Sequence, residues 1–505
     1  MKWHFVRVVA LSMVLGAAAH AAIAVGSLTA DMTTTEAVIA PVTTYHRIRI
    51  GGREVRYAAT FSETLLSDEA GRPQATISCT SYVRERVRDP SIRPVVFLFN
   101  GGPGASSSPL HFGAFGPRRQ TDQRDAKGVR LLADNPATLL DTADLVFIDP
   151  VGTGFSRVRP GGDPGLYWSV EGDSKAALDL IRTWLRDNGR GGSPLYIVGE
   201  SYGGFRLATM MQYAGDLKIA GLIFISPMLD ASAASAAPGN DLPFVFDLPS
   251  MAAGAWHHEK IDRAGRTVEQ FFEEAARFAQ SDYLLALQQG SALSAAERER
   301  VAARMSTFIG LPAAMIAATN LRVPSETFLQ TLLASEALIV GRLDARITGP
   351  RPSAPPKDPN RPAAADDPAL GLRGSNVIKS EAIGRHLTRD LQVQTAREYI
   401  SLTLDVNFRW NWRTEGARPT FYVNPTAHIA ELMQKQPQTR VLLLGGYFDL
   451  ATPVLAPRHA LTHANVPLER VSMLAFAAGH SPFEGDENRA RVSEAVSEFL
   501  RTPRE

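Results

Sequence analysis

Short runs of apolar residues, each bounded by polar or glycine-rich stretches, recur along the chain. Those with the length of buried strands are Val95–Phe99, Leu145–Ile148, Leu195–Val198, Leu222–Ile225, Val441–Leu444 and Val471–Phe476. Helical patterns lie between some of them, notably at Asp173–Arg186. Continuous apolar strands that alternate with helices are typical of a parallel sheet covered on both faces. The pattern therefore predicts an α/β fold with a mostly parallel central sheet.

Other stretches depart from this alternation. Tyr45–Ile50 and Glu54–Thr60, joined at Gly51-Gly52, predict a β-hairpin. After Asp230 the pattern becomes mostly helical, with segments at Val268–Gln280, Ala295–Phe308 and Pro324–Ile339. Residues 349–368 are dense in Pro, Ala and Asp, which predicts a flexible loop. We therefore expect one α/β domain (22–230 and 421–505) interrupted by a helical cap insertion (231–420) that contains the loop.

Residues 1–21 have the pattern of an export signal. Lys2 and Arg7 supply positive charge, and an apolar stretch too short to span a bilayer follows them. Ala19-His20-Ala21 fits a cleavage site of the small-x-small type. We expect an exported protein, periplasmic or secreted, with a membrane anchor as the alternative interpretation of this segment.

Composition argues against nucleic acid and membranes as partners. The net charge is +1 over 505 residues, and the arginines are scattered, so nothing favours nucleic acid or an anionic membrane surface. No later stretch reaches transmembrane length, so we expect no stable membrane insertion. Cys79 is the single cysteine, which forbids any disulfide within the chain. Stability must come from core packing, which a chain with 45% hydrophobic residues can supply.

The segment Gly199-Glu200-Ser201-Tyr202-Gly203 directly follows the apolar run Leu195–Val198, and a helical pattern follows it. A strand, a tight turn and a helix are the setting of a nucleophile elbow, which lifts a serine hydroxyl off the end of a sheet. Glycines at both flanks avoid a Cβ where the turn is crowded. The pattern predicts Ser201 as the nucleophile of an acyl-transfer enzyme, with an ordinary glycine-rich turn as the alternative.

A serine nucleophile needs a base and an acid that orients the base, which follow the serine in the order acid then base on such sheets. Asp449 and His480 each come just after a predicted strand end, where active sites of open α/β sheets collect. We predict these two residues as acid and base. The rival acids are Asp344 and Asp405, and the rival bases are His257, His258, His386, His428, His459 and His463.

A glycine-rich loop, Asn100-Gly101-Gly102-Pro103-Gly104, follows the run Val95–Phe99. Such a loop can present backbone N–H groups to a developing oxyanion, and the residue after the nucleophile supplies another donor. The candidates are Gly102 and Tyr202. No Gly-Lys-Ser/Thr follows the loop, which argues against phosphate binding, and no metal-ligand spacing is evident, so we expect no cofactor and no metal.

Four segments together resemble the serine carboxypeptidases, the family of carboxypeptidase Y and cathepsin A. They are Phe99–Ser107, Leu145–Asp149 with Gly152–Ser156, Tyr196–Gly204 and Ala478-Gly479-His480. The resemblance implies an α/β-hydrolase fold, a peptide substrate and release of its C-terminal amino acid. By motif position it also implies that Asn100 and Glu200 bind the substrate's terminal carboxylate. A homodimer, which occurs among such proteins, is left open.

The chain departs from the family pattern at two places. Ala114 stands where the family usually has a second glutamate, so the usual carboxyl pair with Glu200 cannot form. Ala105 replaces the usual cysteine of the glycine loop, which suggests a bacterial branch. Because Ala114 weakens the case for carboxylate recognition, an esterase or acyltransferase with the same Ser201, Asp449 and His480 is the alternative function. A binding protein without catalysis is the third alternative.

Overall fold

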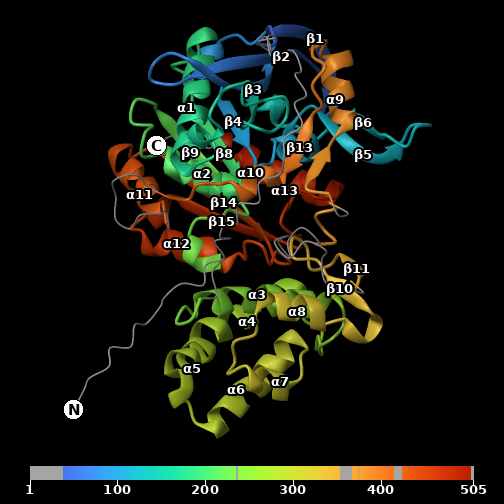
Figure 1. The fold of residues 1–505 in the computed structure, drawn as a ribbon, viewed down its shortest axis with the longest axis vertical. Coiled ribbons are helices and arrows are strands. Elements are labelled where there is room, and N and C mark those ends of the chain that lie inside the picture. The colour runs from blue at the N-terminus through green and yellow to red at the C-terminus, as the bar shows by residue number, and fades with distance from the viewer. Residues whose placement is uncertain (1–37, 235–236, 353–366, 373–374, 414–423, 502–505) are drawn as a thin grey trace, which may run out of the picture. The chain divides into compact units, whose positions relative to one another are not determined.

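The structure is a computed structural model that describes residues 38–234, 237–352, 367–372, 375–413 and 424–501 (Figure 1). Nine strands of these ranges form one sheet in the order β1-β2-β3-β7-β4-β8-β9-β14-β15. Their bounds are β1 Val42–Ile50, β2 Arg53–Ser67, β3 Pro73–Arg84, β4 Val95–Phe99, β7 Asp144–Asp149, β8 Leu195–Glu200, β9 Ile219–Ile225, β14 Arg440–Gly446 and β15 Val471–Phe476. From β7 to β15 all neighbours are parallel. The predicted mostly parallel sheet is confirmed.

The antiparallel part of the sheet begins with the predicted hairpin. Strands β1 and β2 pair from Ile50 and Arg53 outward around Gly51 and Gly52, which both have positive φ. Strand β3 continues the antiparallel series and joins β2 to β7. Strand β3 was not predicted from the sequence because its polar and apolar residues mix, although most of them are buried.

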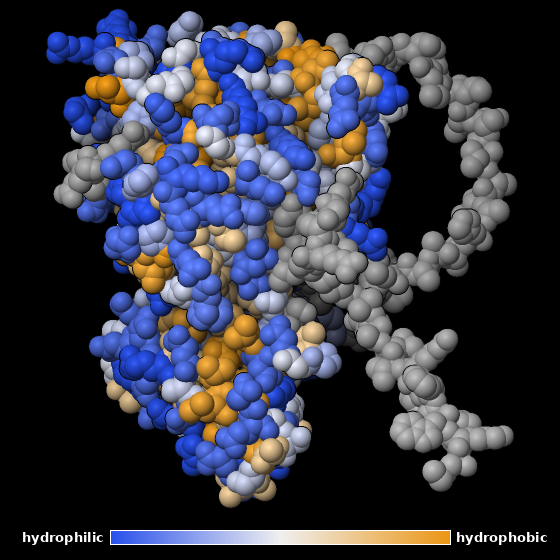
Figure 2. All heavy atoms as spheres, turned by 90° about the vertical axis from the view of Figure 1, so that its left-hand side faces the viewer, coloured by the Kyte–Doolittle hydropathy of each residue, from blue (hydrophilic) through white to orange (hydrophobic). Residues whose placement is uncertain are grey.

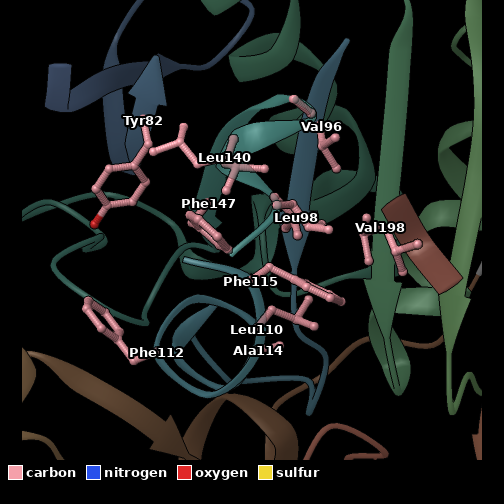
Figure 3. Packing of buried hydrophobic residues seen from close by; sticks show 14 of the residues in the cluster. Tyr82, Val96, Leu98, Leu110, Phe112, Ala114, Phe115, Leu140, Phe147 and Val198 are labelled. Atoms are coloured by element: carbon pink, nitrogen blue, oxygen red, sulfur yellow. The ribbon is translucent and has the colours of Figure 1, made fainter. Parts of the chain in front are cut away.

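Helices cover both faces of the sheet, which explains why β4, β7, β8 and β9 are buried along their whole length. One hydrophobic cluster packs α1, α2, α11 and α12 against one face. A second cluster packs α13 and the π-helix η2 (Pro109–Phe115) against the other (Figure 3). The helix bounds are α1 Val170–Asp187, α2 Tyr202–Met210, α11 Thr426–Lys435, α12 Leu455–His463 and α13 Asp486–Arg501.

The segment after Asp230 carries helices with a core of their own. They are α3 Leu242–His257, α4 Val268–Phe278, α5 Leu284–Gln289, α6 Ala295–Ile309, α7 Ala313–Ala318 and α8 Ser325–Thr331, drawn in green and yellow in Figure 1. Their hydrophobic cluster also contains Tyr447, Phe448 and Leu450, which follow β14. The helical segment and the second half of the sheet therefore share one core.

The expected helix over Pro324–Ile339 is wrong in its second half. Helix α8 ends at Thr331, and Ala337 has a left-handed backbone with φ 57°. Leu338–Val340 then forms strand β10, which pairs with β11 at Thr348–Pro350. The β-branched Ile339 and Val340 favour a strand, and helical periodicity did not separate them from the preceding turn. Residues 353–366, most of the loop expected at 349–368, lie outside the described residues.

Two further strand pairs and two short helices were not anticipated. Strands β5 (Arg118–Arg124) and β6 (Arg130–Asp134) form a hairpin, and β12 (Val377–Lys379) pairs with β13 (Ile400–Thr403). Helices α9 (Glu381–Arg385) and α10 (Leu404–Phe408) flank the second pair. Figure 2 shows one face of the molecule, where hydrophilic residues cover most of the described surface because the apolar side chains fill these cores.

Candidate active site

Ser201 occupies a sharp turn between β8 and α2. Its backbone has φ 61° and ψ −129°, a conformation that costs free energy for a residue with a Cβ and that is typical of nucleophile elbows. The N–H of Ser201 donates to the carbonyl of Ile225 at 3.0 Å, which ties the turn to the neighbouring strand β9. A Cβ on Gly199 would lie 2.3 Å from the carbonyl oxygen of Gly203, so the flanking glycines are sterically required.

Asp449 and His480 lie on adjacent loops and contact each other. His480 Nδ1 is 2.9 Å from Asp449 Oδ2, and the Asp449 carboxylate is fully buried. Its Oδ1 accepts the N–H groups of Ala451 and Thr452, and the Thr452 hydroxyl donates to Oδ2 at 2.7 Å. The carboxylate is therefore held in one orientation by four donors, counting the imidazole. Sequence reasoning missed Thr452, which lies only three residues after Asp449.

The electrostatics of this pair favour opposite charges. Burial would raise the pKa of Asp449, but the charge of His480 and the hydrogen bonds from His480 and Thr452 outweigh it and lower that pKa. Burial would lower the pKa of His480, and the charge of Asp449 outweighs it and raises that pKa. With its Nδ1–H directed at Asp449, the neutral imidazole can accept a proton at Nε2. The carboxylate stabilises the resulting cation until the proton is returned.

Residues 342–345 of the expected insertion bond directly to both of these loops. The carbonyl of Arg342 accepts the N–H of Leu450 at 2.9 Å, and the carbonyl of Leu343 accepts the N–H of His480 at 2.7 Å. The N–H of Ala345 donates to the carbonyl of Phe448 at 2.9 Å. We call residues 342–345 the bridging segment, because these main-chain bonds fix the loops of Asp449 and His480 relative to each other.

The glycine-rich loop lies against the N-terminus of α2. A Cβ on Gly101 would lie only 2.4 Å from the backbone nitrogen of Tyr202, so the two chains approach as closely as glycine allows. Gly102 follows with φ 101°. The loop is fixed further along, where Gly104 accepts the N–H of Thr403 at 2.8 Å. The backbone of Gly102 and the first turn of α2 therefore lie at one pocket, which both line.

Glu200 is buried beside Ser201, and both of its carboxyl oxygens accept hydrogen bonds. Asn100 Nδ2 donates to Oε2, and Ser481 Oγ donates to Oε1 at 2.7 Å. Burial raises the pKa of Glu200 to about 7, against the charge of His480 and the two hydrogen bonds. Near neutral pH this carboxyl group therefore changes between an acceptor and a donor of hydrogen bonds.

Ala114 lies on η2 within an apolar core. It is fully buried beside Leu110 and Phe115, and its carbonyl accepts a hydrogen bond from Asn135 Nδ2 at 2.7 Å (Figure 3). The polar contacts of Glu200 come instead from Asn100 and from Ser481, the residue after His480. Position 114 supplies no carboxyl group to Glu200, and a hydroxyl from a different loop contacts Glu200 instead.

One pocket of about 660 Å³ brings most of the candidates together. Asn100, Gly102, Glu200, Ser201, Tyr202 and His480 line it, while Asp449 lies behind His480 and is not part of the wall. Residues of the expected insertion complete it, including Arg342, Leu343, Asp367, Leu370 and Asn407. A separate pocket of about 420 Å³, between residues 135–142 and α13, contains none of the candidates.

None of the rival acids and bases lines the pocket around Ser201. Asp344, on the bridging segment, forms an ion pair with Arg346. Asp405 is exposed on α10. Their histidine counterparts are engaged in other contacts: His258 with the carbonyl of Ala345, His386 with Asp390, and His459 stacked on His463. His257 packs near His258 and Phe448, and His428 lies on α11.

Neither a metal-ligand cluster nor a membrane-spanning helix is found in the described ranges. Within them no group of three or more His, Cys, Asp or Glu side chains is arranged to hold a metal ion. None of the helices there combines the length and the hydropathy needed to cross a membrane. The expected export signal at residues 1–21 lies outside the described residues, so neither finding bears on it.

Comparisons with known proteins agree with this geometry. Residues 81–215 match the family described as serine carboxypeptidase. Serine carboxypeptidase-like 51 of Arabidopsis thaliana is 37% identical over 141 residues (26% of this chain, 28% of the relative), and serine carboxypeptidase 1 of Hordeum vulgare is 32% identical over 134 residues (26% of each). The match thus spans about a quarter of each relative.

The comparison with solved structures extends over most of the chain. The crystal structure of Kex1(delta)p, a prohormone-processing carboxypeptidase from Saccharomyces cerevisiae, superposes with a TM-score of 0.53 at 14% identity. The superposition covers 87% of this chain and 91% of that one. At this identity the likeness shows the fold alone, and the predicted α/β-hydrolase fold with a mostly parallel sheet is confirmed.

Proposed function

We propose that this chain, whose residues 81–215 match the serine carboxypeptidase family, is a serine-type carboxypeptidase that removes C-terminal amino acids from peptides. One observation carries the proposal: the strained Ser201, the Asp449–His480 pair and the Asn100–Glu200 pair meet at a single pocket. The first two features provide acyl transfer, and the third provides recognition of a carboxylate at the leaving side of the reaction.

In this mechanism Ser201 Oγ attacks the last peptide carbonyl carbon while His480 Nε2 takes the hydroxyl proton. The oxyanion that forms accepts hydrogen bonds from the N–H groups of Gly102 and Tyr202, and Asp449 keeps the imidazole oriented. His480 then gives the proton to the departing amine, and the C–N bond breaks. Water, deprotonated by His480, hydrolyses the ester on Ser201 and restores the free enzyme.

The Asn100–Glu200 pair selects a substrate whose chain ends one residue after the scissile bond. Asn100 Nδ2 and a protonated Glu200 are hydrogen-bond donors, and a terminal carboxylate is the acceptor that fits them. An ionised Glu200 would repel that carboxylate, so binding requires the protonated form. The raised pKa of Glu200, about 7, makes this form available near neutrality.

An esterase or acyltransferase is the second candidate, and the apolar site of Ala114 favours it. Without a second carboxyl group at that place, recognition of the terminal carboxylate rests on fewer donors. The same Ser201, Asp449 and His480 would then transfer an acyl group from an ester. The two candidates share their chemistry and differ in whether the leaving group must carry a carboxylate.

The test compares N-blocked dipeptides with their C-terminal amides and with matched simple esters, for wild type and Ser201→Ala, over about pH 4 to 8. A carboxypeptidase releases the amino acid from the free acid far faster than it cleaves the amide, and Ser201→Ala abolishes release. Equal rates on acid and amide, or hydrolysis of esters alone, would move the function to the second candidate. Retained hydrolysis by Ser201→Ala would remove Ser201 from the mechanism.

The pattern of residues 1–21 supports export, so the proposed site of action is the periplasm or the exterior of the cell. The proposed domain division, with residues 231–420 as an insertion in the hydrolase core, agrees with the helices that separate β9 from β14. Size-exclusion chromatography with light scattering will determine whether the protein is a monomer or a homodimer.

A further inference from the structure

Arg342 lies on the pocket wall and has a fixed backbone. Its N–H donates to Asp367 Oδ2 at 3.1 Å, and its carbonyl accepts the N–H of Leu450 at 2.9 Å. The residue lines the same pocket as Ser201 and His480, and its side chain is partly buried. The main chain at this point is anchored on both sides, which fixes where the Arg342 side chain starts on the pocket wall.

The guanidinium of Arg342 makes no ion pair or hydrogen bond with any residue of the described ranges. Other shielded arginines are paired: Arg206 with Asp173, Arg93 with Asp144, and Arg346 with Asp344. A partly buried cation without an ion-pair partner costs desolvation free energy. A charge left in this state at a pocket wall is a recognition element for an anion that arrives from outside.

Asp247 and Asp367 interact electrostatically with Arg342, but neither forms an ion pair with it. Asp367 directs its carboxylate to the backbone N–H groups of Arg342, Leu343 and Ala369. Burial raises the pKa of Asp247 to about 7, against the charge of Arg342, so Asp247 is only partly ionised near neutral pH. Among the lining residues His480 is the other basic group, and it is committed to Asp449.

We propose that Arg342 forms a subsite that binds the carboxylate side chain of a glutamate or aspartate in the substrate, and this inference rests on the proposed function. A guanidinium and a carboxylate can form two parallel hydrogen bonds, which gives the pair direction as well as strength. The terminal carboxylate of the substrate is assigned to Asn100 and Glu200, on the wall formed by the sheet. Arg342 belongs to a different part of the wall, together with Leu343, Asp367 and Leu370, so it is assigned to a side chain of the substrate.

The test measures kcat/KM for matched N-blocked dipeptides that carry Glu or Gln at the penultimate or at the terminal position. Wild type is expected to prefer Glu over Gln by about tenfold at one of the two positions, which identifies the residue that Arg342 contacts. Arg342→Gln is expected to lose that preference, Arg342→Lys to keep part of it, and Arg342→Glu to reverse it in favour of Gln. The preference is expected to weaken with salt.

Arg409→Gln is the matched control, because Arg409 is exposed, lies outside the pocket and carries the same charge. Its Glu-to-Gln ratio is expected to equal that of wild type. Equal ratios in wild type and Arg342→Gln would overturn the inference, and so would a loss in Arg342→Gln that is the same for Glu and Gln substrates. Wild-type cleavage of the Gln dipeptides tests the proposed function separately.

If wild type cleaves none of these dipeptides, the proposed function fails, and a binding measurement still tests Arg342. Calorimetry of Ser201→Ala with the Glu and Gln dipeptides is then compared with Ser201→Ala/Arg342→Gln. Tighter binding of the Glu dipeptide that requires Arg342 supports the subsite, and indifference to Glu or Gln overturns it.

Discussion

Ser481 Oγ donates a hydrogen bond to Glu200 Oε1 at 2.7 Å, across 281 positions of the sequence. The hydroxyl comes from the residue next to His480, so the base and the partner of the buried carboxyl group share one loop. Asn100 Nδ2 donates a hydrogen bond to the other carboxyl oxygen of Glu200, Oε2. With Ala114 in an apolar core, Ser481 supplies the contact that fixes how Glu200 faces the pocket.

Ser481→Ala is expected to lower kcat/KM for free-acid dipeptides about tenfold, because Glu200 loses one of the two donors that position it. The hydrogen bond from Ser481 lowers the pKa of Glu200, so its loss raises that pKa further. The alkaline limb of the pH profile should therefore move to higher pH. Ser481→Thr keeps the hydroxyl and should behave as wild type. An unmoved limb in Ser481→Ala would contradict the positioning role.

Glu200→Gln is expected to change the shape of the pH profile. Glu200, with a pKa of about 7, donates to the terminal carboxylate only when protonated, so kcat/KM for free acids should fall as pH rises through about 7. Glutamine donates at every pH, and the alkaline fall due to Glu200 should disappear. The acid limb, which reports the raised pKa of His480, should remain. Rates measured across pH with the amide as a control substrate check this; an unchanged alkaline fall would exclude Glu200.

Asp449→Asn is expected to lower kcat by about 10⁴-fold with little change in fold, because the amide no longer holds His480 in the required tautomer. Asp405→Asn is the matched control, since Asp405 is exposed and outside the pocket. Steady-state kinetics and circular dichroism of both variants test the assignment. Activity near wild type in Asp449→Asn would assign the acid to another residue.

Arg206→Ala is expected to destabilise the protein by about 3–5 kcal/mol, because it leaves Asp173 buried without its partner. Arg206 also donates to the carbonyl of Asn100 at 2.5 Å, so the loss should reduce activity as well. The exposed pair of Arg186 and Asp187 provides the control, and Arg186→Ala should cost about 0–1 kcal/mol. Urea unfolding of the two variants checks both values.

The sequence alone was enough to predict those parts of the fold and the site that depend on neighbouring residues. The strand β8, the turn at Ser201 and the helix α2 follow from one continuous segment, because glycine placement and apolar periodicity act over a few residues. The loops of Asp449 and His480 could also be predicted, since each follows a recognisable strand. The expected roles of these residues stay predictions until the variants are measured.

Contacts between distant segments could not be predicted in this way. Ser481 and Arg342 carry no motif, and only the folded chain places the first against Glu200 and the second on the pocket wall. Strand β3 was missed because its buried positions hold both polar and apolar residues, so the sequence shows no regular alternation. Short elements such as β10 and β12 depend on their pairing partners, which periodicity does not identify.

In the proposed mechanism, the bridging segment couples substrate selectivity to reaction rate through its main chain. Residues that shape the pocket wall and residues that orient the proton-transfer pair share main-chain hydrogen bonds at Arg342, Leu343 and Ala345. Replacing the wall with that of a relative would therefore alter turnover together with preference. In directed evolution, exchange of the bridging segment should succeed only when the loops at 447–452 and 478–484 are exchanged together with it.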